Sequence, residues 1–158
     1  MAMAMYAMVA SLVKDTGMFT PPHHTASLIA SDGAMNASVG AAASGKSFHF
    51  VFTAVVLGSV IHMAVGAGYG ALYGLIAARL DVRGHAAPAV GISYGGVVAA
   101  ASAFVGLPVA AAILGSGDQI ATMAETVGWG TFLVEHLIFG LALGVLLGAR
   151  RVRTATRS

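Results

Sequence analysis

Apart from tyrosine, three ionisable side chains lie well inside long apolar stretches of this sequence: His62, Glu135 and His136. The two histidines are 74 residues apart (136 − 62), and each is followed by a run with glycine at every fourth position. Neutral imidazole is a ligand for haem iron and a hydrogen-bonding group for a quinone. Two histidines at one depth in a membrane would therefore hold a b-type haem or a quinone. The alternative is that each one hydrogen-bonds a neighbouring hydroxyl or carbonyl group and serves packing alone.

Glu135 is the one acidic residue in any of the predicted membrane spans. A carboxylate inside the bilayer costs a few kcal/mol unless it is paired or protonated, so an acid at such a position is a functional candidate. A protonated Glu135 would transfer protons or contact a quinol. The alternative is that Glu135 lies near enough to the outer interface to reach water or a polar group of a partner.

The glycines that follow each histidine predict close helix packing. In lipid, helices associate through close backbone contact, and glycine at every fourth position makes a groove on one face of a helix. Both rows have the pattern H-x3-G-x3-G-x3-G, which indicates an internal duplication covering one helix of each half. The helix-packing candidates, with Gly58 extending the first row, are Gly58, Gly66, Gly70, Gly74, Gly140, Gly144 and Gly148.

Composition restricts the class of protein. Of the 158 residues, 58% are hydrophobic and 9% are charged, whereas a soluble domain is about 25% charged. This excludes a disordered chain, an ordinary soluble enzyme and a nucleic-acid binder. The absence of cysteine excludes disulfides, iron–sulfur clusters and cysteine-based zinc sites. The sequence has no catalytic triad, phosphate loop or dinucleotide fingerprint, so we predict no catalytic residue and no metal site.

An all-α, polytopic bundle of transmembrane helices in a single membrane domain must position these residues. Three apolar runs are long enough to cross a bilayer, namely 49–78, 86–117 and 128–149. Proline removes a helical hydrogen bond, so Pro108 should kink the second span over residues 104–107. The glycine rows predict a glycine zipper between the helices.

Two segments precede the first full span. Residues 1–13 are apolar, but they make only about 20 Å of helix against a hydrocarbon core of about 30 Å. They form either a half-inserted helix or the end of a span that begins upstream of Met1. Residues 14–47 are polar, and we expect an outward-facing loop with a short surface helix at 25–30. His23 and His24 are expected as a solvated pair in this loop, with weak metal binding as the alternative.

The arginines indicate the orientation. All six lie either just after the first full span or in the tail 150–158. Because basic residues accumulate on the cytoplasmic side, the tail is expected in the cytoplasm. Aromatic residues at the other membrane boundary agree with this orientation, and they are Phe48, Phe50, Phe52 and Trp129.

The pattern of histidine, spaced glycines, an aromatic residue and a basic stop resembles that of small bacterial inner-membrane proteins of the YagU-like type. The residues that carry the resemblance are Gly17–Pro22, His62–Gly74 and His136–Gly148. The resemblance implies a location in the bacterial inner membrane and a small helical bundle, and it implies no biochemical reaction. The shortened first helix departs from that family.

The sequence favours a non-catalytic membrane protein, namely an accessory or structural subunit that packs against a larger membrane complex or against itself. The lipid bilayer and other membrane subunits are its expected partners, and nucleic acid is not. One alternative is a redox or proton-handling subunit with haem or quinone at His62 and His136 and with Glu135 as the proton group. A second alternative is a small transporter or channel, suggested by the duplication and by the proline in the second span.

Overall fold

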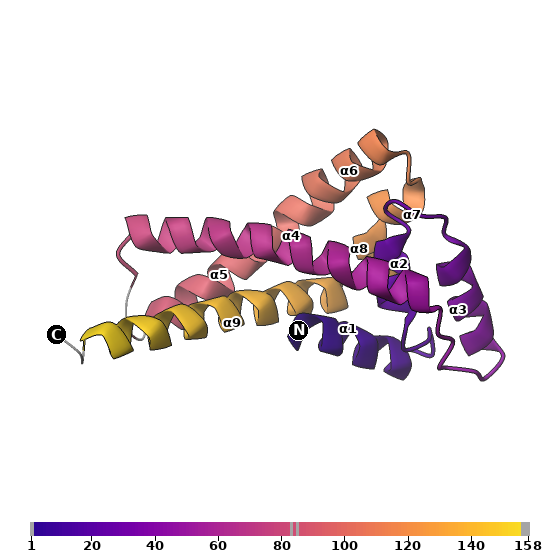
Figure 1. The fold of residues 1–158 in the computed structure, drawn as a ribbon, viewed down its shortest axis with the longest axis horizontal. Coiled ribbons are helices and arrows are strands. Elements are labelled where there is room, and N and C mark those ends of the chain that lie inside the picture. Colours follow the sequence, from indigo (N-terminus) through magenta and orange to yellow (C-terminus); the bar gives the residue numbers. More distant parts are fainter. Residues whose placement is uncertain (1, 83, 85, 156–158) are drawn as a thin grey trace.

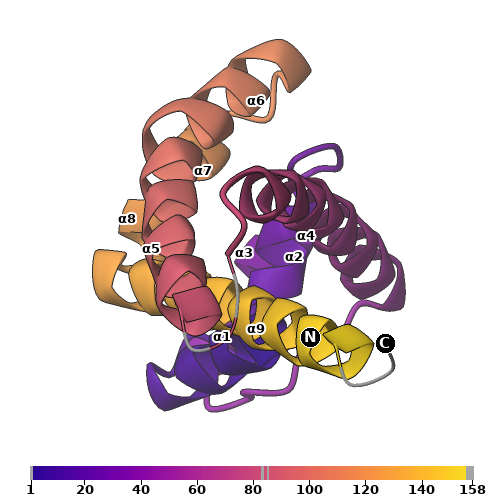
Figure 2. The same cartoon turned by 90° about the vertical axis from the view of Figure 1, so that its left-hand side faces the viewer.

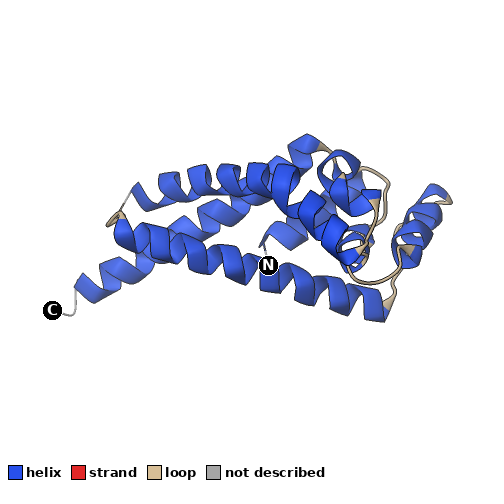
Figure 3. Cartoon of the chain, turned by 90° about the horizontal axis from the view of Figure 1, so that it is seen from above, coloured by secondary structure: helices blue, strands red, loops and turns tan. Residues whose placement is uncertain are grey.

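A computed structural model describes residues 2–82, 84 and 86–155. These residues form helices and short connections, with no strand among them (Figure 3). Three helical segments are long and apolar enough to cross a membrane: Phe52–Arg79, Ala86–Leu114 and Trp129–Ala149. The prediction of three apolar spans in an all-helical chain is therefore confirmed for the described residues. A shorter apolar helix, Met3–Val13, precedes them.

The elements follow one another along the chain as helices of very different length. In order they are α1 (Ala2–Val13), α2 (Thr20–Ala26), α3 (Gly33–Ala43), α4 (Phe52–Arg79), α5 (Ala86–Ala101), η1 (Ser102–Gly106), α6 (Leu107–Leu114), α7 (Asp118–Ala121), α8 (Met123–Val127) and α9 (Trp129–Ala155).

The long helices lie along one axis, and the short helices gather at one end of it. Helices α4 and α9 run in the same direction, and α5 runs in the opposite direction and packs against α9 (Figure 1). Helices α2, α3, α7 and α8 lie at the end where α4 and α9 begin, which we name the capped end. Helix α1 packs against the first turns of α9, next to the capped end. Seen along the axis, α4 stands apart from the α5–α9 pair (Figure 2).

The second span changes its helical form just before Pro108. Residues Ser102–Gly106 are π-helical, and the Leu107 N–H donates to the Ser102 carbonyl, five residues earlier. In a regular α-helix, the carbonyl left without a donor by Pro108 would be that of Phe104, four residues earlier. With hydrogen bonds that span five residues, it is the carbonyl of Ala103. Proline has no N–H to donate, and a π-helical turn is one way for a helix to absorb that loss. Beyond it, α6 bends away from the bundle (Figure 1).

The expectation of a loop over 14–47 is wrong, because this segment contains α2 and α3. Pro21 and Pro22 occupy the first turn of α2 instead of preventing a helix. The first N–H groups of a helix have no internal partner, so proline is tolerated there and its fixed φ favours the helix start. The short helix expected at 25–30 thus begins earlier, at Thr20, and ends at Ala26.

Candidate functional site

Helices α5 and α9 meet backbone to backbone, with the most extensive contact of any two described helices. A Cβ atom added to Gly140 would overlap the carbonyl oxygen of Gly91, and one added to Gly144 would overlap that of Ala87. A Cβ atom at Gly95 would likewise meet the α9 backbone. The second glycine row therefore lies against a row of small residues on α5, where no side chain fits between the helices.

The first glycine row has different neighbours. A Cβ atom at Gly66 would lie 3.9 Å from the Phe139 ring, and one at Gly70 would lie 3.5 Å from a Leu143 methyl group. Both are ordinary van der Waals distances to side chains of α9. A Cβ atom at Gly74 would meet nothing within 4 Å. This row accommodates side chains on one part of α4 and borders open space on another.

Two further glycine candidates lie at the ends of the rows. Gly58 touches the short helix α2, where an added Cβ atom would overlap the Pro22 carbonyl oxygen. Gly148 is less crowded, since its Cβ atom would lie 3.6 Å from the Ala87 side chain. The glycines of the two rows thus pack on three different elements.

The two histidines of the sequence pattern lie at the same level of the bundle. The contacts between α4 and α9 join residues 73 positions apart (139 − 66 and 143 − 70), and the two helices are parallel. His62 and His136 are 74 positions apart, so they lie at nearly the same height. The structure therefore brings these two candidates together.

The His136 ring is held by its own helix. Its side chain is 7% exposed, its ring packs 4.4 Å from that of Phe132, and its Nδ1 lies 2.7 Å from the Phe132 carbonyl oxygen. A carbonyl only accepts, so Nδ1 carries the proton and donates. Nε2 then keeps its lone pair and has no hydrogen-bond partner among the described residues. This is the tautomer in which a histidine can bind a metal centre or accept a hydrogen bond.

Glu135 is next to His136 in sequence but points about 100° away around the helix. Its side chain is 7% exposed, and its Oε1 has no hydrogen-bond partner in the part of the chain that the structure describes. Its charged neighbour is Lys14, at the end of α1. The Lys14 ammonium donates to the Val127 carbonyl at 2.8 Å and to the Thr131 hydroxyl, one helical turn before Glu135. Glu135 therefore points in a different direction from His136 and lies near Lys14, the residue that follows α1.

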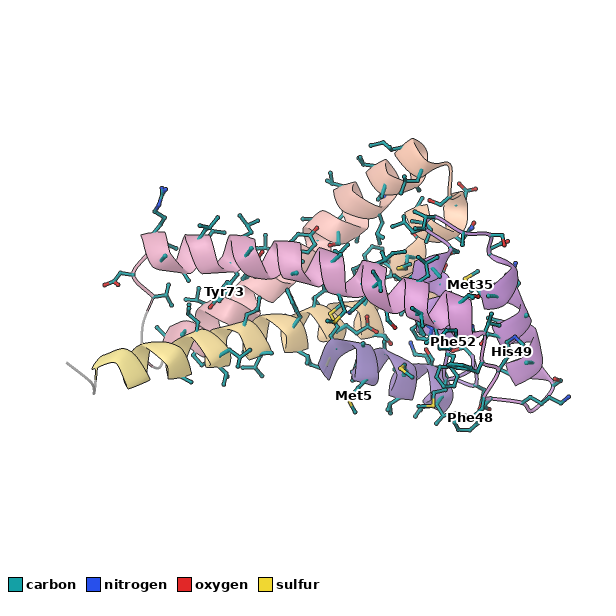
Figure 4. The ribbon with its side chains drawn as sticks, in the orientation of Figure 1. Met5, Met35, Phe48, His49, Phe52 and Tyr73 are labelled. Atoms are coloured by element: carbon teal, nitrogen blue, oxygen red, sulfur yellow. The ribbon has the colours of Figure 1, made fainter. Side chains whose placement is uncertain are left out.

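A set of tyrosines between α4 and α5 was not singled out in the sequence. The Tyr94 hydroxyl donates to the Tyr69 backbone carbonyl at 2.7 Å, and the Ser102 hydroxyl donates to the Tyr69 hydroxyl at 3.2 Å. The Tyr73 side chain is 2% exposed, points from α4 towards α5, and donates to the Ala87 carbonyl at 3.2 Å (Figure 4). The signal for them is the spacing of His62, Gly66, Tyr69 and Tyr73, which lie three or four residues apart and share one face of α4.

The expectation of a solvated pair at His23 and His24 is wrong. Both side chains are buried in α2, at 1% and 3% exposed. The His24 Nε2 lies 2.8 Å from the Gln119 carbonyl oxygen, and the His23 Nε2 accepts the N–H of Val51 at 3.3 Å. The prediction of a loop is wrong because Pro21 and Pro22 begin a helix rather than end one. The two histidines that follow them are buried in that helix.

The candidate side chains occur as two pairs, His62 with His136 and Glu135 with Lys14. Among the described residues, no group of three or more histidine, aspartate or glutamate side chains could hold a metal ion. The histidine pair offers the His136 lone pair and a half-buried His62 across the space between two parallel helices. Glu135 and Lys14 offer a carboxyl and an ammonium group near the first turns of α9.

Comparisons with models of known protein families, with curated proteins and with solved structures found no match. The resemblance to YagU-like proteins and the internal duplication therefore stay predictions.

Proposed function

We propose that this protein is a non-catalytic integral subunit of a bacterial inner membrane, where it packs against other membrane subunits or against a second copy of itself. Its C-terminus lies in the cytoplasm and its capped end faces outward. The lipid bilayer covers the rest of its apolar surface. The proposal extends to the glycine rows, which we interpret as a glycine zipper inherited from an internal duplication.

Charge supports this orientation. Arg79 ends α4 at the opposite end from the capped end, and Arg150, Arg151 and Arg153 belong to the last turns of α9, which ends on that same side. Basic residues next to a span are retained on the cytoplasmic side. Exposed aromatic side chains stand at the capped end, where Phe48 and Phe52 are 66% and 68% exposed (Figure 4). Aromatic side chains are typical of the membrane–water interface.

The observation that carries the accessory role is the exposure of α4. Only 6% of the most apolar stretch of α4 is buried, against 28% for each of the other two spans. Helix α4 touches α5 and α9 through a few tyrosines and two glycines, and its main partner is the short helix α2. Small residues at a free helix face allow another helix to approach closely. A neighbouring subunit at α4 would bury the face that this chain leaves open.

Site-specific photocrosslinking in the native membrane tests the proposal. A benzophenone side chain replaces Leu75 on α4, which is 67% exposed, and a control replaces Ile113 on α6, which is 77% exposed. We expect a protein adduct of defined mass from position 75 and none from position 113. Mass spectrometry then identifies the adduct as a membrane subunit or as a copy of this chain. Lipid adducts alone at both positions would overturn the proposal.

A second candidate function rests on the histidine pair. His62 and His136 lie at nearly the same height on parallel helices, and the Nε2 atom of His136 has a free lone pair. These two features favour a b-type haem or a quinone held between the two side chains. In this alternative Glu135 would handle protons, with Lys14 as its charged neighbour.

An absorbance spectrum of the purified protein decides on the haem. If a haem is bound between the two histidines, the spectrum should show a Soret band that shifts on reduction. This band should be lost in His62→Ala and in His136→Ala. The control is His49→Ala, which changes a histidine that lies in the loop before α4, outside the spans (Figure 4). A featureless spectrum, together with no quinone in the organic extract, would eliminate this candidate.

A further inference from the structure

We propose that His23 makes the joint between α2 and the start of α4 sensitive to acid, so that α2 releases α4 when the capped end meets low pH. This joint consists of α2, the connection at 49–51 and the first turns of α4. The inference does not depend on the accessory role or on a cofactor.

The hydrogen bonding of His23 requires a neutral ring. Its Nε2 lies 3.3 Å from the backbone nitrogen of Val51, the residue just before α4, and accepts that N–H. An accepting nitrogen carries no proton, so the proton of the neutral ring is on Nδ1. Nδ1 is buried and has no partner among the described residues. A second proton would have to go to Nε2, where it would face the Val51 N–H and break the bond.

The surroundings of His23 also oppose a positive charge. Its side chain is 1% exposed, and burial lowers the pKa of His23. The ring of His49 lies 6.1 Å away and lowers that pKa further. Helix α3 carries no charged residue. The remaining charged or titratable groups on α2 and the elements packed against it are Tyr6 on α1, His24 on α2, His62, Tyr69, Tyr73 and Arg79 on α4, and Asp118 on α7.

The sign of the effect follows from the direction of the shift. The pKa of His23 is lower in the folded protein than in an unfolded chain, so folding favours the neutral ring. The stabilisation from neutral His23 is fully present above about pH 6.5 and is lost as the pH falls below that value. Acid therefore weakens the joint and alkali does not.

The joint matters because α2 is the main packing partner of α4. The α2 backbone lies directly on Gly58, where no side chain would fit. The contacts that Gly66, Tyr69, Gly70 and Tyr73 of α4 make with α5 and α9 lie further along the helix. Release of α2 would free the first turns of α4 while the tyrosine contacts hold its other half.

His24 provides a matched control on the same helix. Its side chain is 3% exposed, and its Nε2 faces the Gln119 carbonyl oxygen at 2.8 Å. This nitrogen donates, and a protonated imidazole still donates from it. Protonation of His24 therefore leaves its hydrogen bond intact, although burial lowers the pKa of His24 as well.

Distance measurements between two spin labels test the proposal. The chain has no cysteine, so Ala30→Cys after α2 and Val56→Cys on α4 label two exposed sites without background. For the otherwise unchanged protein in lipid nanodiscs, we expect one narrow distance at neutral pH. A second, longer distance should grow as the pH falls from about 6.5 to about 5, the range over which histidine takes up its proton.

The variants assign this change to His23. In His23→Gln the amide oxygen replaces the accepting Nε2 and does not titrate, so we expect the narrow distance at both pH values. His24→Gln should keep the acid-induced distance. If His23→Gln lacks the narrow distance at neutral pH, His49→Gln decides instead. Removing the ionisable ring at position 49, which lowers the pKa of His23, should move the midpoint of the transition to higher pH.

Three results would overturn the proposal. They are one narrow distance for the unchanged protein at both pH values, an acid-induced distance that persists in His23→Gln, and a transition that disappears in His24→Gln. An unchanged midpoint in His49→Gln would also contradict it.

Discussion

The two glycine rows share one sequence pattern and have different surroundings. On α9, Gly140 and Gly144 lie against the backbone of α5, where even a methyl group would overlap a carbonyl oxygen. On α4, Gly66 and Gly70 lie against side chains of α9, and Gly74 borders open space. The same spacing therefore makes a backbone contact in one helix and a shallow or uncovered groove in the other. Within the described residues, the groove at Gly66, Gly70 and Gly74 on α4 meets no other helix backbone.

The largest effect should come from the α9 row. We expect Gly140→Ala to lower the free energy of unfolding by about 3 kcal/mol, because the new methyl group forces two helix backbones apart. Steric-trap unfolding in lipid micelles would measure the loss. A change below about 0.5 kcal/mol, the size of a typical surface substitution, would show that α5 and α9 do not meet in this way.

Gly58 on α4 should be the next most sensitive. We expect Gly58→Ala to cost about 2 kcal/mol, because the methyl group overlaps the Pro22 carbonyl but α2 is short and can shift. Hydrogen exchange should rise in α2 and in the first turns of α4, with α9 unchanged. Exchange that rises equally in all three helices would contradict a local joint.

The tyrosine bridges to α4 should contribute less. We expect Tyr94→Phe to cost about 1 kcal/mol, the worth of one hydrogen bond, because its hydroxyl donates to the Tyr69 carbonyl at 2.7 Å. The same unfolding measurement applies. Tyr6→Phe is the control, since the Tyr6 hydroxyl makes no hydrogen bond among the described residues. Equal losses in the two variants would argue against the bridge.

The smallest effect should come from the open end of the α4 row. We expect Gly74→Ala to leave the isolated protein as stable as before or to stabilise it by up to about 1 kcal/mol, because alanine favours a helix over glycine. In the same unfolding measurement, a loss as large as that of Gly140→Ala would remove the difference between the two rows.

Hydropathy was sufficient to predict the three spans, because a run of apolar residues long enough to cross the bilayer has few other stable forms. The packing partners were harder to predict. The row Ala87, Gly91, Gly95 and Ala99 on α5 has the same four-residue spacing as the rows that were singled out, and that spacing was its available signal. The burial of His23 had no such signal, because it depends on where α2 lies against α4.

The candidate site divides in the same way. The equal height of His62 and His136 follows from their spacing on two parallel helices, and it could be predicted from the sequence. The direction of Glu135 could not, since α1 and its Lys14 come from the other end of the chain. A position on a helix defines an angle around that helix, and only the neighbouring helices define what lies at that angle.

By itself, the sequence determined that this is a helical protein with three apolar segments long enough to cross a membrane, because hydrophobicity and length are properties of local segments. Only the tertiary structure decided which glycines meet a backbone, which histidines are buried and which lysine accompanies Glu135. Those outcomes depend on contacts between segments far apart in the chain. The same glycine spacing on α4 and on α9 therefore leads to different packing in the two helices.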